Sequence, residues 1–196
     1  MIRCAPQDDD IPLSGWLFQT MFRSTHVITW PLLAVLVTIL PGCGATVDLA
    51  AERHAKAVKA LIDLGAEVQE VEDDVTHDRG TYVTLFREHF APEGEVQDDV
   101  LKLIREIQNL FLDVTNTPVS DDAMPNLALL PNLHVLNATA TRLTDRGLKL
   151  IASSRDLRLL KLNRTRITDD GLEYLRELPS LRLLYLGDTD LSAAAL

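Results

Sequence analysis

Leucines and small polar residues recur with a period of 24 residues in the second half of the chain. The phrases Val119-Ser120-Asp121, Leu143-Thr144-Asp145 and Ile167-Thr168-Asp169 begin 24 residues apart, and Leu191-Ser192 falls on the next count. Two further columns keep this period, with threonine at 117, 141, 165 and 189 and leucine at 112, 136, 160 and 184. A fixed period of roughly 20–50 residues is typical of stacked repeats. Residues 110 to 196 are therefore predicted to form a pile of similar coils.

Each repeat predicts a strand, a turn and a short helix. The alternation Leu184-x-Leu186 places both leucines on one face of a short strand, parallel to the strand one repeat away. The threonine column then supplies hydroxyls to backbone groups that the turn leaves open. Ser120, Thr144 and Thr168 suit the N-cap of a helix with Asp in its first turn. A helical spacing of apolar residues closes the core from the other side, at Leu148, Ile151, Leu172 and Leu175.

The skeleton Leu181-x-x-Leu184-x-Leu186-x-x-Thr189-x-Leu191 resembles a leucine-rich repeat. The phrase Leu-Thr-Asp-x-Gly-Leu makes the segment similar to bacterial repeats of the ribonuclease-inhibitor-like type. The resemblance covers residues 110 to 196. It implies an α/β solenoid with a parallel sheet on the concave face and helices on the convex face.

The segment before the repeats predicts a tether and an N-terminal α/β cap over residues 43 to 81. Its helix, residues 47 to 64, aligns one apolar stripe of Val47, Ala51, Ala55, Val58, Leu61 and Ile62. Strands are expected at residues 66 to 71 and 82 to 86, with an acidic loop between them. Because residues 96 to 100 echo residues 119 to 123, we expect a degenerate first repeat from residue 82. The repeats then fill residues 82 to 196, with the last one incomplete and its strand an open edge.

An almost unbroken apolar run covers residues 27 to 40, between Arg23 and the ending Leu40-Pro41-Gly42-Cys43. A membrane-spanning helix needs about 20 apolar residues, so this run suits the core of a signal peptide better. The ending resembles a bacterial lipobox, which implies that Cys43 is the first mature residue and carries a lipid. Residues 21 to 42 are then a lipoprotein signal peptide. An uncleaved N-terminal anchor and ordinary signal cleavage are the alternatives.

Residues 1 to 20 do not fit a leader, since Asp8-Asp9-Asp10 places negative charge where positive charge is required. We expect translation to begin at Met21 and the first 20 residues to be an upstream extension that is not translated. The chain has two cysteines, Cys4 and Cys43, so a mature chain from Cys43 would contain no disulfide.

The charge pattern argues against nucleic-acid binding. The net charge is −10, and residues 44 to 109 account for most of it, with 7 basic and 15 acidic side chains, or −8. General nucleic-acid binding rests on Lys and Arg. Histidines 54, 77, 89 and 134 lack metal-ligand spacing, and no phosphate loop or nucleophile elbow is present. We therefore expect no cofactor, no metal and no enzyme activity.

The residues between the inward leucines should face the concave, solvent-exposed side of the sheet. One such column is apolar, and the next is mixed; together they are the predicted partner-binding residues Phe111, Val135, Leu159 and Leu183, and Asp113, Asn137, Lys161 and Tyr185. The bland alternative is that these side chains only shield the sheet or lie under a flanking segment. A third column, His134, Arg158 and Arg182, could meet an acidic partner or lipid headgroups, or be solvated.

The sequence thus predicts a non-catalytic protein-binding or scaffold module. It would be held by a lipid on Cys43 to the bacterial cell envelope, outside the cytoplasm, with another protein on its concave face. A structural envelope protein that self-associates through its open C-terminal edge is one alternative. A fragment of a longer repeat protein is another.

Overall fold

The computed structural model describes residues 3–4, 48–72 and 79–192. The leader, Cys43 and most of the acidic loop lie outside the described residues, as does the end of the last repeat. The hypotheses on signal peptide, start codon and lipid therefore stay predictions.

The strands form one sheet in the order β1-β7-β6-β5-β4-β3-β2. Their bounds are β1 (Arg3–Cys4), β2 (Glu67–Glu72), β3 (Arg79–Thr84), β4 (Leu110–Asp113), β5 (Leu133–Asn137), β6 (Leu159–Lys161) and β7 (Leu183–Tyr185). The strands β4 to β7 are parallel, and Leu136, Leu160 and Leu184 pair in register. Parallel strands one 24-residue coil apart are what the periodicity predicted, and this prediction is confirmed.

The two edges of the sheet differ from the rest. At one edge β2 is antiparallel to β3, and β3 is parallel to β4. At the other edge the two-residue strand β1 pairs with β7, so the edge expected to be open is bordered by another part of the same chain.

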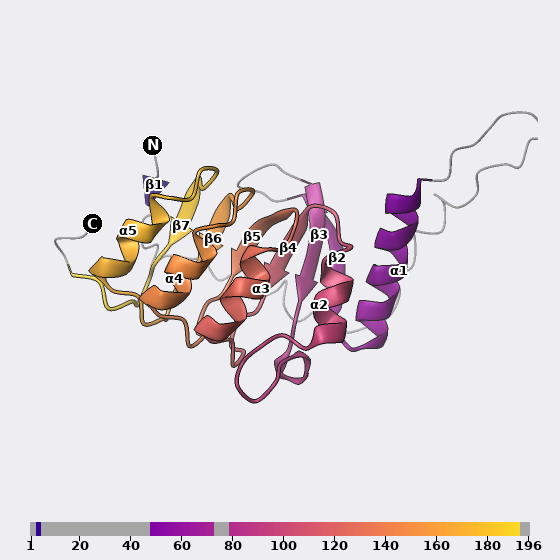
Figure 1. Ribbon diagram of the computed structural model, residues 1–196, viewed down its shortest axis with the longest axis horizontal. Helices are drawn as coiled ribbons and strands as arrows, with labels where there is room; N and C mark the ends of the chain where they lie inside the picture. The colour runs from indigo at the N-terminus through magenta and orange to yellow at the C-terminus, as the bar shows by residue number, and fades with distance from the viewer. Residues whose placement is uncertain (1–2, 5–47, 73–78, 193–196) are drawn as a thin grey trace, which may run out of the picture.

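The helices lie in a row along one face of the sheet (Figure 1). The row contains α2 (Asp98–Ile104), α3 (Met124–Ala128), α4 (Asp145–Ile151) and α5 (Leu172–Leu175), with the short 3-10 helices η2 (Arg87–His89), η3 (Asp121–Ala123) and η4 (Asp169–Gly171). Helix α1 (Leu49–Asp63) stands at the end of the row, beside α2 and β2 (Figure 1). Among the described residues, no helix has the length and apolar character needed to span a membrane.

The core lies between the sheet and the helices. The inward strand leucines, including Leu112, Leu136 and Leu160, are fully buried, and Leu148, Ile151 and Leu175 meet them from the helices. These are the residues that the helical spacing assigned to the core, so this assignment is confirmed. Burial of such side chains is the main favourable term in folding.

The turn after each strand has the same two features. The hydroxyl of Thr141 donates to the carbonyl of Ala138 at 2.8 Å, and the threonines at 117, 165 and 189 make the same bond within their own coils. The residue before each of these threonines has a positive φ, at Asn116, Ala140, Arg164 and Asp188. The sequence predicted the hydroxyl bonds but not this left-handed column.

Ala140 adopts its φ of 56° without the side chain that eases this conformation in Asn or Asp. Ala140→Gly should stabilise the protein by about 0.5–1 kcal/mol, because glycine has no Cβ to strain there. Asn116→Gly is the matched control in the neighbouring coil and should change stability little. Urea unfolding of both variants checks this; a destabilised Ala140→Gly would contradict it.

Consecutive coils are joined by aspartate. Asp121 accepts the backbone N–H of Thr144 at 2.9 Å and its hydroxyl at 2.6 Å, and Asp145 does the same for Thr168 at 2.9 and 2.7 Å. Asp169 accepts from Ser192, and this hydroxyl bond is the main cause that lowers the pKa of Asp169. The expected N-capping is therefore partly wrong: only Thr144 caps its helix, by accepting from Arg146. The hydroxyls of Thr144 and Thr168 instead donate to the carboxylate of the coil before.

These aspartates explain the glycines two residues into each helix. A methyl group on Gly147 would lie 2.5 Å from Oδ1 of Asp121, and Gly171 stands in the same relation to Asp145. The equivalent residue one coil earlier is Ala123, and the residue 26 positions before it is Gln97 instead of Asp. The predicted close approach at the glycines is confirmed, and its cause is the carboxylate.

Gly147→Ala should destabilise the protein by about 1–3 kcal/mol through this collision. Combined with Asp121→Ala, the same change should cost much less, because the colliding oxygen is gone. Urea unfolding of the single and double variants gives the coupling energy. The pair Gly147→Ala and Asp122→Ala is the control, and it should be additive.

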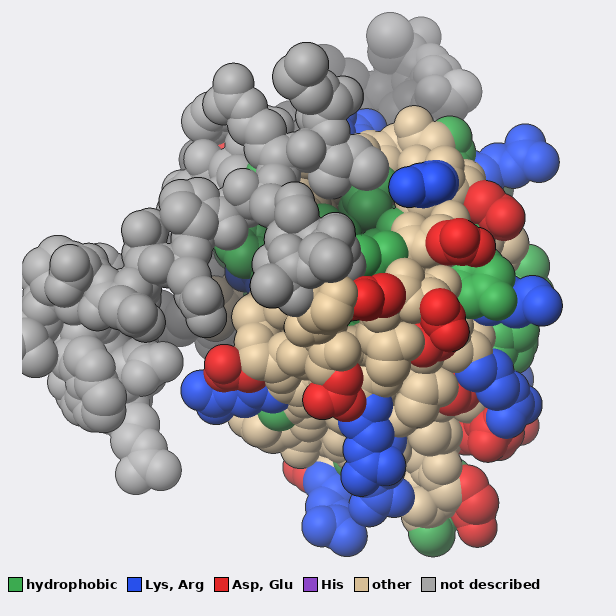
Figure 2. All heavy atoms as spheres, turned by 90° about the vertical axis from the view of Figure 1, so that its left-hand side faces the viewer, with side chains coloured by type: hydrophobic (Ala, Val, Ile, Leu, Met, Phe, Trp, Pro, Cys, Tyr) green, Lys and Arg blue, Asp and Glu red, His purple; other side chains and the backbone are tan. Residues whose placement is uncertain are grey.

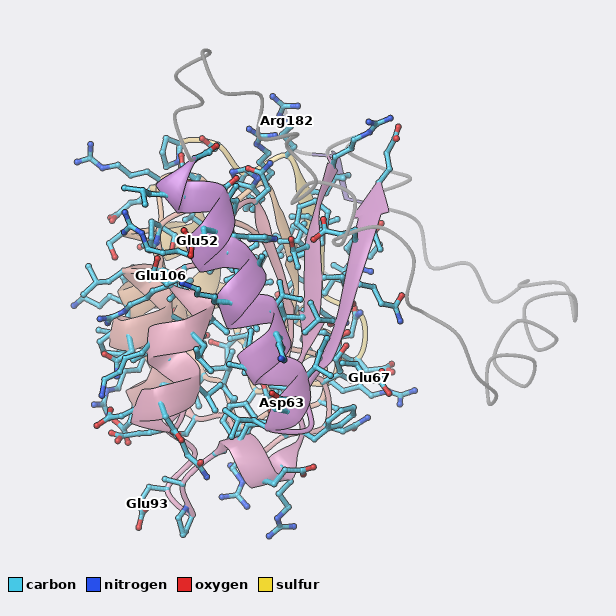
Figure 3. All side chains as sticks on the ribbon, turned by 90° about the vertical axis from the view of Figure 1, so that its right-hand side faces the viewer. Glu52, Asp63, Glu67, Glu93, Glu106 and Arg182 are labelled. Carbon is cyan, nitrogen blue, oxygen red and sulfur yellow. The ribbon has the colours of Figure 1, made fainter. Side chains whose placement is uncertain are left out.

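Helix α1 turns a different face to the protein than its apolar stripe predicted. Ala51, Ala55 and Ile62 are exposed, whereas Ala57 and Leu61 are buried. His54 accounts for this rotation: its Nδ1 accepts the backbone N–H of Gln108 at 3.1 Å, and its Nε2 lies 3.4 Å from Glu70. A polar side chain thus occupies the packed face, and Figure 3 views this end of the molecule.

A second histidine joins the end of α1 to the next segment. His89 is 2% exposed, and its Nδ1 accepts the backbone N–H of Phe86 at 2.9 Å. Its Nε2 lies 3.2 Å from the carbonyl of Leu64, the residue that ends α1. The sequence did not reveal this bond, because its partner is 25 residues away.

Candidate interaction surface

The apolar column predicted for the concave face lies on the side of the sheet opposite the helices. Phe111, Val135, Leu159 and Leu183 are aligned by the strand register, with Tyr82 of β3 next to Phe111. They form a cluster separate from the main core. The strand alternation therefore assigned these side chains to the correct face.

Most of this column is not solvent-facing, contrary to the sequence prediction. Phe111 is 1% exposed, Val135 5% and Leu159 1%. Bulky side chains on strands about 4.8 Å apart shield one another, and Val71, Tyr82, Leu183 and Tyr185 pack against them. Leu183 is only half-buried, so the accessible apolar part of the column lies at its C-terminal end.

The polar column splits into two parts. In the first, Asp113 accepts the hydroxyl of Tyr82 at 2.6 Å and the amide of Asn137 at 2.9 Å, and its other oxygen accepts the N–H of Thr115. Asn137 in turn accepts the hydroxyl of Thr139 at 2.7 Å. These groups satisfy one another. Tyr82 was not singled out from the sequence, although its place in an alternating strand pointed to this face.

The second part of the polar column is a cation on an aromatic ring. The Nζ of Lys161 lies 5.4 Å from the ring centroid of Tyr185, and both residues are half-buried. Such pairs contribute about 0.5–1 kcal/mol at accessible sites. Within the described part of the chain, Lys161 has no carboxylate partner.

The third column lies where the strands begin. The N–H of Arg158 donates to the carbonyl of His134, and the N–H of Arg182 donates to the carbonyl of Arg158, both at 2.8 Å. The structure therefore stacks these residues as predicted. The side chain of Arg182 is exposed at this edge (Figure 3). Figure 2 looks onto the C-terminal end, where hydrophobic side chains stand among acidic and basic ones.

A polar hollow at the other end of the molecule is structural. His54, Glu70 and Thr81 line it, and the hydroxyl of Thr81 donates to Glu70 at 2.9 Å. The hydrogen bond from His54 is the main cause that lowers the pKa of Glu70, against the opposing effect of burial. Among the residues that the structure describes, no three His, Cys, Asp or Glu side chains are grouped to hold a metal.

The comparisons with known proteins give one distant structural likeness. The ectodomain with leucine-rich repeats of the receptor kinase SOBIR1 from Arabidopsis thaliana is 14% identical, with a TM-score of 0.30, covering 72% of this chain and 97% of that chain. No protein-family model matches the chain, and no curated protein sequence matches it. The assignment of the fold as a stack of parallel coils therefore rests on the strand register itself.

Proposed function

We propose that the protein is a non-catalytic module that binds another protein on the concave face of its sheet. The observation that carries this proposal is the second apolar cluster, on the face that no helix covers, which ends in the accessible pair Leu183 and Tyr185. A sheet face that needed only solvation would carry polar side chains in this column. Aromatic residues beside a cation are enriched at the centres of interfaces.

The repeats are best understood as leucine-rich repeats of the bacterial type, with α1 and β2 as the N-terminal cap. Two features support this cap: β2 pairs antiparallel with β3, and His89 and His54 join α1 to the segment after it. A cap of this kind covers the core of the first coil, which would otherwise be open to water.

We further propose that a lipid on Cys43 holds the protein to the bacterial cell envelope, outside the cytoplasm. The lipobox-like sequence supports this, together with the short distance from Cys43 to Asp48, which caps α1. Radiolabelled palmitate should be incorporated by the wild type and not by Cys43→Ala. No incorporation by the wild type would remove the anchor from the proposal.

Partner binding is tested by placing a photo-crosslinking amino acid at Tyr185 in the full chain in cells. Leu129 is the control position, because it is 71% exposed on a helix at the opposite side. We expect discrete crosslinked products from position 185 that position 129 does not give. The same products from both positions, or none from 185, would contradict the concave-face proposal. Substitution of Phe111 or Leu159 is unsuitable as a test, since both are buried and their loss would destabilise the fold.

A further inference from the structure

We propose that the partner segment on the concave face is an acidic polypeptide that also presents an apolar or aromatic side chain. This inference rests on the proposed function and names the chemistry of its partner. It places the contact at Lys161, Arg182, Leu183 and Tyr185.

The local charge of this surface is opposite to that of the whole chain. The net charge is −10. In the last three coils, however, the concave columns and the turn residues beside them carry the cations Arg158, Lys161, Arg164 and Arg182, and a single anion, Asp188. Asp188 already pairs with Arg164 at 3.4 Å. A positive surface on an acidic protein attracts acidic partners and repels copies of the protein itself.

The two cations that carry the inference frame the accessible apolar pair. Lys161 is the register partner of Tyr185 and lies over its ring, while Arg182 directly precedes Leu183. Residues 182 and 185 are three positions apart along the strand, which corresponds to about 10 Å. Within the described residues, neither Lys161 nor Arg182 has a carboxylate partner. An extended segment with an acid on each side of an apolar residue would satisfy both cations and cover Leu183.

The acids on the same sheet face do not oppose this. Asp113 is held by Tyr82, Asn137 and the N–H of Thr115, and it lies two strands from Lys161. Glu67 belongs to β2, at the far edge of the sheet (Figure 3). The concave face is thus acidic toward β2 and basic toward β7, which would also orient the bound segment.

The test uses the full chain in a nonionic detergent and a labelled peptide, Asp-Glu-Leu-Asp-Tyr-Glu-Leu-Asp. One sibling peptide has Lys at every acidic position, and a second has Ser in place of Leu and Tyr. Fluorescence anisotropy should show binding of the first peptide only. The double variant Lys161→Glu and Arg182→Glu should weaken it by about tenfold or more, and added salt should weaken it as well.

The control is a matched pair on the helix side. Lys149 lies over the ring of Tyr174 at 5.8 Å, so Lys149→Glu with Arg176→Glu makes the same change in charge on the other face. This control should alter affinity by less than about twofold. Equal weakening by both double variants, or equal binding of the Lys sibling, would overturn the inference.

Two further outcomes are decisive. If no peptide binds while crosslinks from Tyr185 persist, the acidic partner is wrong and the proposed function stands. If phosphatidylglycerol vesicles bind through Lys161 and Arg182 and the peptide does not, the cations contact lipid headgroups instead, and the inference is overturned.

Discussion

Asp121→Ala is expected to lower the free energy of unfolding by about 2–4 kcal/mol. The carboxylate accepts two hydrogen bonds from Thr144 in the next coil, at 2.9 and 2.6 Å. Its removal leaves a backbone N–H and a hydroxyl without their charged acceptor, at the junction of two coils. Because coils are stable only when stacked, the loss weakens the whole pile.

The neighbouring residue provides the control. Asp122 is exposed, and its printed bond is a surface ion pair with Arg146 at 3.1 Å. Asp122→Ala should therefore cost less than about 0.5 kcal/mol. Urea unfolding compares the two variants, and equal losses would show that the carboxylates do not join the coils.

His89→Ala is expected to cost about 3–5 kcal/mol. The variant removes a buried ring and leaves two backbone groups without partners, the N–H of Phe86 and the carbonyl of Leu64. Since Leu64 ends α1, this helix should also exchange its amide hydrogens faster than α4 does.

Two companions make the second prediction specific. His89→Asn can still accept the N–H of Phe86 and should recover part of the loss. Glu88→Ala changes an exposed neighbour and should be almost neutral. If His89→Ala were as stable as Glu88→Ala, the imidazole would not join α1 to the first coil.

The sequence was sufficient for the parts of the fold that repeat. A fixed period of 24 residues places Leu136, Leu160 and Leu184 side by side, and the alternation around them separates the core face from the concave face. The chain repeats its own solution, so one strand predicts the next. The hydroxyl bonds of the threonine column followed from the same register.

Features that depend on one pairing across the chain could not be predicted. Helix α1 has more apolar positions than it buries, so its packed face depends on the bond of His54 to Gln108, 54 residues away. The left-handed conformation of Ala140 is set by the turn and not by alanine. The burial of Leu159 likewise depends on the neighbours of the column, whereas periodicity determines only its face.

The most direct test of the account is the pairing of β5, β6 and β7 in solution, measured by nuclear Overhauser effects between backbone protons. The account predicts contacts of Val135 with Leu159 and of Asn137 with Lys161, continued to Leu183 and Tyr185. Contacts of Val135 with Lys161 and of Asn137 with Leu159 would indicate antiparallel strands. That result would remove both the stacked coils and the concave surface on which the proposed function depends.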